Sequence, residues 1–323
     1  MASSEQPVAS PGNIFEKFDD PVRKTLMERL SRQDGFEIMP RRIVFYLWFS
    51  DIHVLEAFVE KVDPHKWANL RKFMNGQYNF AYVWAGQGMT SGEGQEDETD
   101  ISESAATATT IPECPMTAWT TPNLDMAHII PVKLDGTKDA DLEYNLVWHT
   151  LETFWGKEQT EDWRKILVAG DKLSTQFPAN MIALNTHAHT YWDCARIAFK
   201  PISVNPERTE MLLLFHWLPF PDDIRTVSTD QPSIITTNPY QGGFLSEPSE
   251  RRHCLFHTVG REVLRSGYMF TVKTTDPTEL PLPSLELLQL RWHLNRIAAM
   301  QGRDEDEDDD GDDHTDDDSD DDL

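Results

Sequence analysis

The sequence predicts a mixed α+β fold, in which a helical N-terminal unit precedes a segment where helices and strands alternate. Apolar residues recur at spacings of three and four over residues 15–30, which is typical of a helix with one buried face. Residues 210–218 are almost continuously apolar and predict a buried strand. Leucine and isoleucine residues at helical spacing over residues 287–297 predict a last helix, and Ser284 is its candidate N-cap.

The chain is expected to divide into six segments, mainly because its acidic residues are unevenly spread. Residues 304–322 contain 15 acidic residues and no basic one, and residues 86–110 contain six acidic residues and no basic one. Both stretches have too few large apolar residues to offset the entropy cost of ordering. The predicted segments are a disordered start (1–13), a helical N-terminal region (14–85), an acidic linker rich in Ser, Thr and Gly (86–110), a core domain (111–221), a C-terminal extension that packs on that domain (222–303) and a disordered acidic tail (304–323).

Charge and cysteine usage narrow the possible function classes. The 55 acidic residues outnumber the 29 basic ones, but much of the excess lies in the two acidic stretches. Because nonspecific DNA binding depends on Lys and Arg releasing counterions, any contact with nucleic acid must come from a local basic patch. Cys114, Cys194 and Cys254 form no Cys-x-x-Cys pair, which argues against a disulfide framework or a four-cysteine zinc site.

An intracellular location, in the nucleus or the cytoplasm, is the expectation from the same features. Few cysteines fit a reducing compartment, and the first residues lack the basic and then apolar pattern of a signal peptide. No stretch approaches the ~20 apolar residues of a membrane span, so we expect no membrane partner.

Several elements follow from local patterns. Residues 40–49 predict either a strand or a buried helix, and residues 51–62 predict a helix that stops before Asp63-Pro64. An apolar stripe over residues 144–155, ended by Gly156, and a second helix over residues 158–168, with Trp163 and Leu167 inward, predict a helical scaffold.

The C-terminal half is expected to hold a loop, a strand pair and several core residues. Residues 222–251 predict a loop, and residues 255–275 predict a pair of strands that turns at Ser266-Gly267. His149, His216 and Trp217 fall in apolar segments and are expected in the core.

Four polar residues are candidates for a functional centre, although a histidine among apolar residues is more often a core residue and a His–Asp pair four residues apart is more often a surface pair. His128 lies among apolar neighbours just before Pro131, which ends a strand. Asn180 follows after an intervening segment of 51 residues. His189 and Asp193 are four residues apart, so on a helix they share one face and reach the same divalent ion. His187 is the alternative to His189, although it would point to a different helix face from Asp193.

This order and spacing resemble the HNH endonucleases. Upstream, the stretch Cys114-Pro115-Met116-Thr117-Ala118 resembles the Cys-x-x-Thr-Gly opening of one HNH subfamily found in fungal proteins, with Ala118 in place of the glycine. That subfamily also has a Trp-rich insertion, like Phe154-Trp155-Gly156 here, and a helix opened by Pro-Leu-Pro-Ser, like the one that begins at Pro281. The resemblance covers residues 113–300.

The resemblance implies an HNH ββα-metal core, extended by a helical insertion and added strands. It implies that His128 is the general base and that Asn180 fixes the loop that aims it. It also implies that His189 and Asp193 bind a divalent ion such as Mg, Mn, Zn or Ni. Many HNH enzymes carry an Asp or His directly before the base, where this chain has Ala127.

Three further residues are candidates from their positions. Asp125, on the same strand face as Ala127, is the candidate for a further metal-binding carboxylate, directly or through water. Arg196 and Lys200, just beyond the predicted helix, are candidates for phosphate contact, and ordinary solvated side chains are the alternative.

The expected function is metal-dependent hydrolysis of phosphodiester bonds in DNA. A histidine with a pKa of about 6.5 is a suitable base near pH 7, and a divalent ion with open positions stabilises the charge on the phosphate. The alternative is a catalytically inactive HNH-derived binding or scaffold protein, which Ala127 favours. The acidic tail is expected to be solvated and disordered, and the alternative is a DNA mimic that covers a basic groove of the same molecule or engages a basic protein partner.

Overall fold

The structure, a computed structural model, describes residues 14, 16–33, 35–60, 113–120, 122–136, 142–218, 232–236 and 254–301. Helices and strands are mixed along these residues, as the predicted α+β class requires. The predicted disordered start, acidic linker and acidic tail lie outside the described residues. Over the described part of the chain, no helix is both long enough and apolar enough to cross a membrane.

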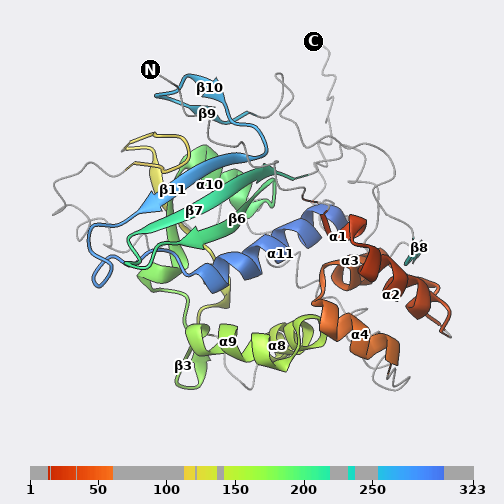
Figure 1. Cartoon of the computed structure of the whole chain (residues 1–323). Helices are drawn as coiled ribbons and strands as arrows, with labels where there is room; N and C mark the ends of the chain where they lie inside the picture. The colour runs from red at the N-terminus through yellow and green to blue at the C-terminus, as the bar shows by residue number, and fades with distance from the viewer. Residues whose placement is uncertain are drawn as a thin grey trace, which may run out of the picture.

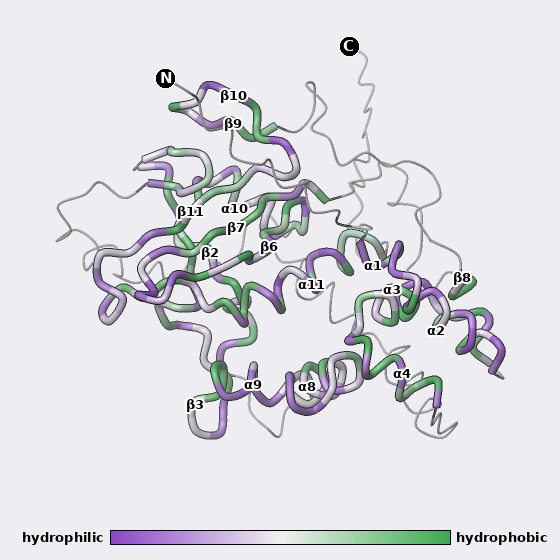
Figure 2. Tube along the Cα trace, in the orientation of Figure 1, coloured by the Kyte–Doolittle hydropathy of each residue, from purple (hydrophilic) through white to green (hydrophobic). Residues whose placement is uncertain are grey.

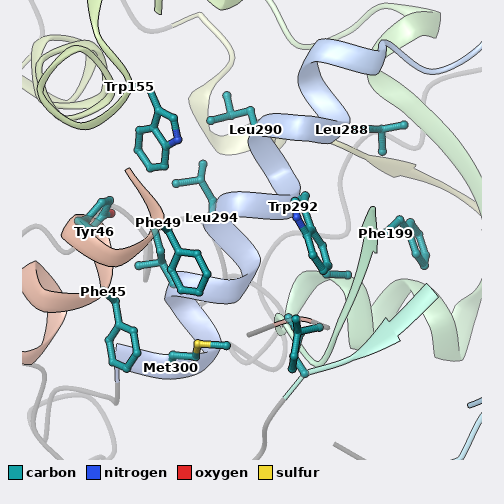
Figure 3. Packing of buried hydrophobic residues seen from close by; sticks show 14 of the residues in the cluster. Phe45, Tyr46, Phe49, Trp155, Phe199, Leu288, Leu290, Trp292, Leu294 and Met300 are labelled. Carbon is teal, nitrogen blue, oxygen red and sulfur yellow. The ribbon is translucent and has the colours of Figure 1, made fainter. Parts of the chain in front are cut away.

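A long C-terminal helix, α11 (Leu285–Gln301), lies at the centre of the molecule (Figure 1). On one side it packs on a three-stranded antiparallel sheet, in which β7 (Glu210–Trp217) lies between β6 (Ile197–Val204) and β11 (Tyr268–Lys273). On another side it packs on α3 (Arg41–Phe49). In Figure 3, aromatic side chains of α3 lie on one side of α11 and Phe199 of β6 lies on the other. One continuous core therefore joins the sheet to the N-terminal helices.

The N-terminal region consists of α1 (Glu16–Asp19), α2 (Pro21–Ser31), β1 (Ile38–Pro40), α3 and α4 (Ile52–Glu60). Asp20 caps α2 by accepting hydrogen bonds from the amides of Val22 and Arg23, and Pro21 occupies its first turn, as helix-start chemistry favours. Residues 40–49, for which strand and helix were both open, mostly form the buried helix α3.

Two basic side chains stabilise the C-terminal end of α3. Arg23 Nη1 donates to the carbonyl of Leu47 at 3.3 Å, and Lys17 Nζ donates to the carbonyl of Phe49 at 2.7 Å. Positive charge at a helix C-terminus is favourable because the last carbonyls are unpaired and carry the negative end of the helix dipole.

The predicted scaffold helices form α8 (Leu142–Trp155) and α9 (Lys157–Leu167), separated by Gly156 with φ of 83°. Trp163 and Leu167 are buried, as predicted. α8 packs on α9 and also on α3 and α4, and the amide of Asp51 donates to the carbonyl of Phe154 at 2.8 Å. The insertion is therefore anchored to the N-terminal region.

One expected core residue is on the surface instead. His149 is exposed, so its predicted place in the core is wrong. It lies on the outer side of α8, whose inner side is formed by Val147, Trp148, Leu151 and Phe154. His216 and Trp217, in contrast, are buried as predicted.

The predicted strand pair that turns at Ser266-Gly267 is wrong. β9 (Phe256–His257) pairs with β10 (Glu262–Val263) across a turn at residues 258–261, whereas β11 pairs with the distant strand β7. Gly267, with φ of 92°, directs the chain into β11. The buried strand β7 was predicted, but its neighbour β6 was not, and the short strand β8 (Pro232–Ile234) pairs with β1 inside a predicted loop. Figure 2 shows β7 as largely hydrophobic and the outer helix α9 as largely hydrophilic.

The last helix begins where the sequence indicated. The hydroxyl Oγ of Ser284 accepts a hydrogen bond from the amide of Leu287 at 3.2 Å, which confirms the N-cap. The four predicted apolar residues of its inner face are all fully buried, namely Leu287, Leu290, Leu294 and Ile297.

Candidate active site

Two strands and one helix bring the predicted site residues together. β2 (Leu124–His128) pairs antiparallel with β5 (Met181–Asn185), and α10 (Thr186–Asp193) follows β5 directly and packs on both strands. Asn185 ends β5 and caps α10, because its Oδ1 accepts a hydrogen bond from the amide of Ala188 at 3.1 Å. The chain thereby places His128 at the end of one strand and carries His189 and Asp193 on the helix.

A tight turn precedes β2. The amide of Cys114 donates to the carbonyl of Trp119 at 2.7 Å, and the amide of Ala118 donates back to the carbonyl of Cys114 at 2.8 Å. Ala118 has φ of 56°, in the left-handed region that favours glycine. A side chain there costs about 1–2 kcal/mol, which explains why the resembling motif has glycine at this place. The hydroxyl of Thr258 donates to the carbonyls of Thr117 and Ala118 at 3.0 Å and holds the turn.

Asn180 is a buried cross-link between two loops. Its Oδ1 accepts from the amide of Ile130 at 2.9 Å, and its Nδ2 donates to the carbonyls of Ile130 at 3.0 Å and Thr175 at 2.8 Å. Its own carbonyl accepts from the amide of Ile129 at 2.8 Å. The side chain has no exposed surface, so it holds the backbone that follows His128.

His128 is half-buried and contacts a side chain that the sequence did not indicate. Its Nε2 lies 3.2 Å from Oε1 of Gln176, and its carbonyl accepts from Nε1 of Trp192 at 3.2 Å. Burial lowers the pKa of His128 below its usual value, and the hydrogen bond to Gln176 partly opposes that effect. Gln176 is itself placed by its neighbour Thr175, whose amide and hydroxyl both donate to Asp135 Oδ1.

His189 lies between two carboxylates. Its Nδ1 is 3.3 Å from Asp125 Oδ2, and its Nε2 is 3.1 Å from Asp193 Oδ2. Burial alone would lower the pKa of His189, but the carboxylates of Asp193 and Asp125 outweigh it, so the pKa is raised. The raised pKa favours the proton on this imidazole, and a metal ion bound by His189 would compete with that proton.

The donor atoms suit a metal held by two protein ligands. Among the described residues, no three His, Cys, Asp or Glu side chains converge on one point. Asp125 and Asp193 approach opposite nitrogens of the His189 ring, so these three side chains do not face one common position. Nε2 of His189 and Oδ2 of Asp193 remain as an adjacent pair, and ions such as Mg²⁺ need only one or two protein ligands when water and phosphate fill the other positions. Ala127 is fully buried and adds no ligand.

The other candidates differ in exposure and in contacts. His187 is exposed on α10, two residues before His189. Arg196 is half-buried at the start of β6, directly after α10. Lys200 is engaged elsewhere, because its Nζ lies 2.8 and 3.0 Å from the two carboxylate oxygens of Glu16 in α1.

Two residues at the site were not predicted, Gln176 and Arg291. Gln176 gave no periodic or motif signal, since its place depends on a loop conformation. Arg291, on α11, lies 3.6 Å from Asp193 Oδ1 through its Nη2. It did leave a signal, because it is four residues after Leu287 and three before Leu294, on the apolar side of the predicted helix.

Part of the chain matches a known protein family. Residues 112–200 match the family model described as HNH endonuclease, which confirms the predicted resemblance for this segment. The matched range contains His128, Asn180, His189 and Asp193, while α11 lies outside it. HNH domains generally bind nucleic acid and use a divalent metal. No curated protein and no solved structure matches the chain.

Proposed function

We propose that this chain is a metal-dependent endonuclease of the HNH type that hydrolyses phosphodiester bonds in DNA. One observation carries the proposal: the base and the metal pair share one site. α10 packs on β2, Trp192 Nε1 of α10 donates to the carbonyl of His128 at 3.2 Å, and His128, His189 and Asp193 all lie within the segment that matches the HNH endonucleases.

His128 has the properties of a general base. Its lowered pKa keeps the imidazole neutral at pH 7. Gln176 Oε1 accepts from Nε2–H, which leaves the lone pair on Nδ1 to take a proton from the attacking water. The same hydrogen bond then stabilises the imidazolium. Asn180 keeps the following backbone in place, and so aims the ring.

His189 Nε2 and Asp193 Oδ2 are proposed to hold the divalent ion. When bound, such an ion stabilises the negative charge that builds on the phosphate and on the leaving oxygen. Asp125 is proposed to accept a hydrogen bond from Nδ1 of His189, because ligand histidines usually donate their second nitrogen to a carboxylate that fixes the ring. This role is proposed in place of the expected one, in which Asp125 supplies a carboxylate to the metal directly or through water.

Plasmid nicking tests the function. Purified protein is incubated with supercoiled plasmid and Mg²⁺, Mn²⁺, Ni²⁺ or Zn²⁺, beside His128→Ala and the matched control His187→Ala. The proposal expects metal-dependent nicking by the wild type and the control, and a loss of at least about 100-fold in His128→Ala, the contribution typical of a general base. Equal nicking by His128→Ala, with an unchanged circular dichroism spectrum, would reject His128 as the base.

A second candidate function has its own supporting observation. With both nitrogens against carboxylates and a raised pKa, His189 forms an ion-pair network that is complete without metal. The unit formed by β2, β5 and α10 would then have only a structural role in a binding or scaffold protein. Absence of Mn²⁺ binding by the wild type would favour this candidate.

Finer features of the function are also proposals. Arg196 is proposed to contact phosphate, since Lys200 is paired with Glu16. The acidic stretch of residues 304–322 is proposed to compete with DNA for basic surface or to bind a basic protein, in the nucleus or the cytoplasm. Removal of residues 304–323 should raise DNA affinity at low salt in the first case and leave it unchanged in the second. The place within the fungal subfamily stays a prediction.

A further inference from the structure

A buried arginine of the C-terminal helix reaches the candidate active site from outside the HNH-matched segment. Arg291 lies on α11, and its side chain is only 1% exposed. Burial lowers its pKa to about 10, so the guanidinium remains charged at pH 7. A buried charge is costly unless hydrogen bonds and opposite charge compensate it. Three groups that compensate Arg291, the carbonyls of Ile129 and Trp192 and the carboxylate of Asp193, belong to the site.

Arg291 connects the strand that carries the base to the helix that carries the metal pair. Its Nη1 donates to the carbonyl of Ile129, the residue after His128, at 3.3 Å. Its Nη2 donates to the carbonyl of Trp192, the residue before Asp193, at 3.1 Å. The guanidinium carbon also lies 5.0 Å from the centre of a Trp192 ring. Two backbone segments of the site are therefore held at a set separation by one planar group.

The same guanidinium orients the carboxylate of Asp193. Nη2 lies 3.6 Å from Oδ1, while Oδ2 faces Nε2 of His189 at 3.1 Å. Oδ1 is thus attracted to the guanidinium on α11, and Oδ2 is directed at the imidazole of His189. Because its two oxygens face different partners, the carboxylate of Asp193 presents Oδ2 to an ion bound beside His189.

The last turn of α10 is fixed by α11 at a second point. Asn295 Nδ2 donates to the carbonyls of Trp192 at 3.3 Å and Ile197 at 3.1 Å. Ala195 closes α10 with φ of 50°, and the amide of Arg196 donates back to the carbonyl of Tyr191 at 2.7 Å, as in a Schellman motif. Two successive turns of α11 therefore support the turn that bears Asp193.

We propose that Arg291 is a positioning residue for the metal pair. It holds Asp193 Oδ2 toward His189 and sets the distance between the base strand and α10, so that α11 is a part of the active site. The inference rests on the proposed function in one respect, namely that His189 and Asp193 bind the ion. Residues that orient metal ligands typically change metal affinity by about 10- to 100-fold when they are mutated.

Mn²⁺ binding to the full chain, measured by electron paramagnetic resonance, tests the proposal. Arg291→Lys keeps the charge but loses the fork, and it should weaken Mn²⁺ binding by about 10-fold. Arg296→Lys is the matched control, because Arg296 is fully buried on the same helix but donates to the carbonyls of Ile14 and Trp292. Its Mn²⁺ affinity should stay within about twofold of the wild type even if both variants lose thermal stability.

If Arg291→Lys fails to fold, a nuclear magnetic resonance measurement on the wild-type chain tests the role of Arg291 instead. Mg²⁺ addition should shift the ¹⁵N resonance of Arg291 Nε and leave that of Arg296 Nε in place. Wild-type Mn²⁺ affinity in Arg291→Lys, no shift at Arg291, or no Mn²⁺ site in the wild type would overturn the inference. A chain whose Mn²⁺ affinity depends on Arg291 as expected, but which does not nick plasmid, would overturn the proposed function alone.

Discussion

At the scale of single residues, the site depends on how each imidazole is partnered. Burial makes His128 less basic, and a neutral amide restores part of its basicity. His189, also partly buried, becomes more basic, because two carboxylates contact its nitrogens. The pKa values of the two histidines in this site are thereby shifted in opposite directions. That division suits one as a proton acceptor and the other as a member of an ion-binding pair.

The Gln176 hydrogen bond predicts a change in the pH profile of nicking. Gln176→Leu removes an acceptor that stabilises protonated His128, so the pKa of His128 falls further. The acidic limb of kcat/KM, where the base becomes protonated, should move to lower pH, and the plateau rate should drop because the base is weaker.

Two variants check this reasoning. Gln176→Glu replaces the amide by a carboxylate, so its acidic limb should move to higher pH. Gln289→Leu changes an exposed glutamine on α11 and should keep the wild-type profile. A profile that does not move in either Gln176 variant would show that His128 is not the titrating base.

The elements of the site differ in how far the sequence predicted them. Helical spacing located α11 and the Ser284 cap, because these features depend on neighbours within one or two turns, whereas α10 was expected from the HNH resemblance. The partner of β11 is a strand about 60 residues earlier, and no local pattern encodes that pairing. For the same reason His189 and Asp193 were predictable as a pair, whereas the approach of Arg291 from α11 was not.

The N-cap of α10 gives a prediction at this scale. Asn185→Ala removes the acceptor of the Ala188 amide and should lower the free energy of unfolding by about 1 kcal/mol, measured by urea denaturation. The first turn of α10 lies next to His189, so fraying of this turn should also lower the Mn²⁺ affinity. Asn185→Ser keeps a capping oxygen and should restore most of the free energy of unfolding and most of the Mn²⁺ affinity. Equal Mn²⁺ affinity in Asn185→Ala and Asn185→Ser would show that the N-cap of α10 does not influence metal binding.

The whole molecule is organised around α11, which buries charge as well as apolar surface. Arg296, on the side toward α3, has its guanidinium 4.3 Å from the ring of Phe49 and 4.1 Å from that of Trp292. Nearby His216 of β7 is buried and its pKa is lowered to about 4, first by burial and then by the charges of Arg296 and Lys200. The core therefore requires His216 to remain neutral.

This requirement predicts a loss of stability in mild acid. The unfolded chain binds a proton at His216 with a pKa of about 6.5, well above the folded value, so stability is full above that pH and is lost as pH falls toward 4. By pH 5 the loss from His216 is about 2 kcal/mol. The raised pKa of His189 acts in the opposite direction and is stabilising at low pH.

A comparison of variants isolates the His216 contribution. Urea unfolding at pH 8 and pH 5 should give a smaller difference for His216→Phe than for the wild type, by about 2 kcal/mol. His149→Asn, at an exposed histidine of α8, should keep the wild-type difference. An unchanged difference in His216→Phe would show that the buried imidazole is not what titrates.

The dependence of plasmid nicking on metal concentration tests the central claim most directly, when it is measured for the wild type, His189→Ala and His187→Ala. We predict that nicking by the wild type and His187→Ala saturates with the same half-maximal Mn²⁺ concentration, and that His189→Ala loses saturation over that range. Nicking that proceeds without added metal in the presence of a chelator, or that saturates identically in His189→Ala, would contradict the account.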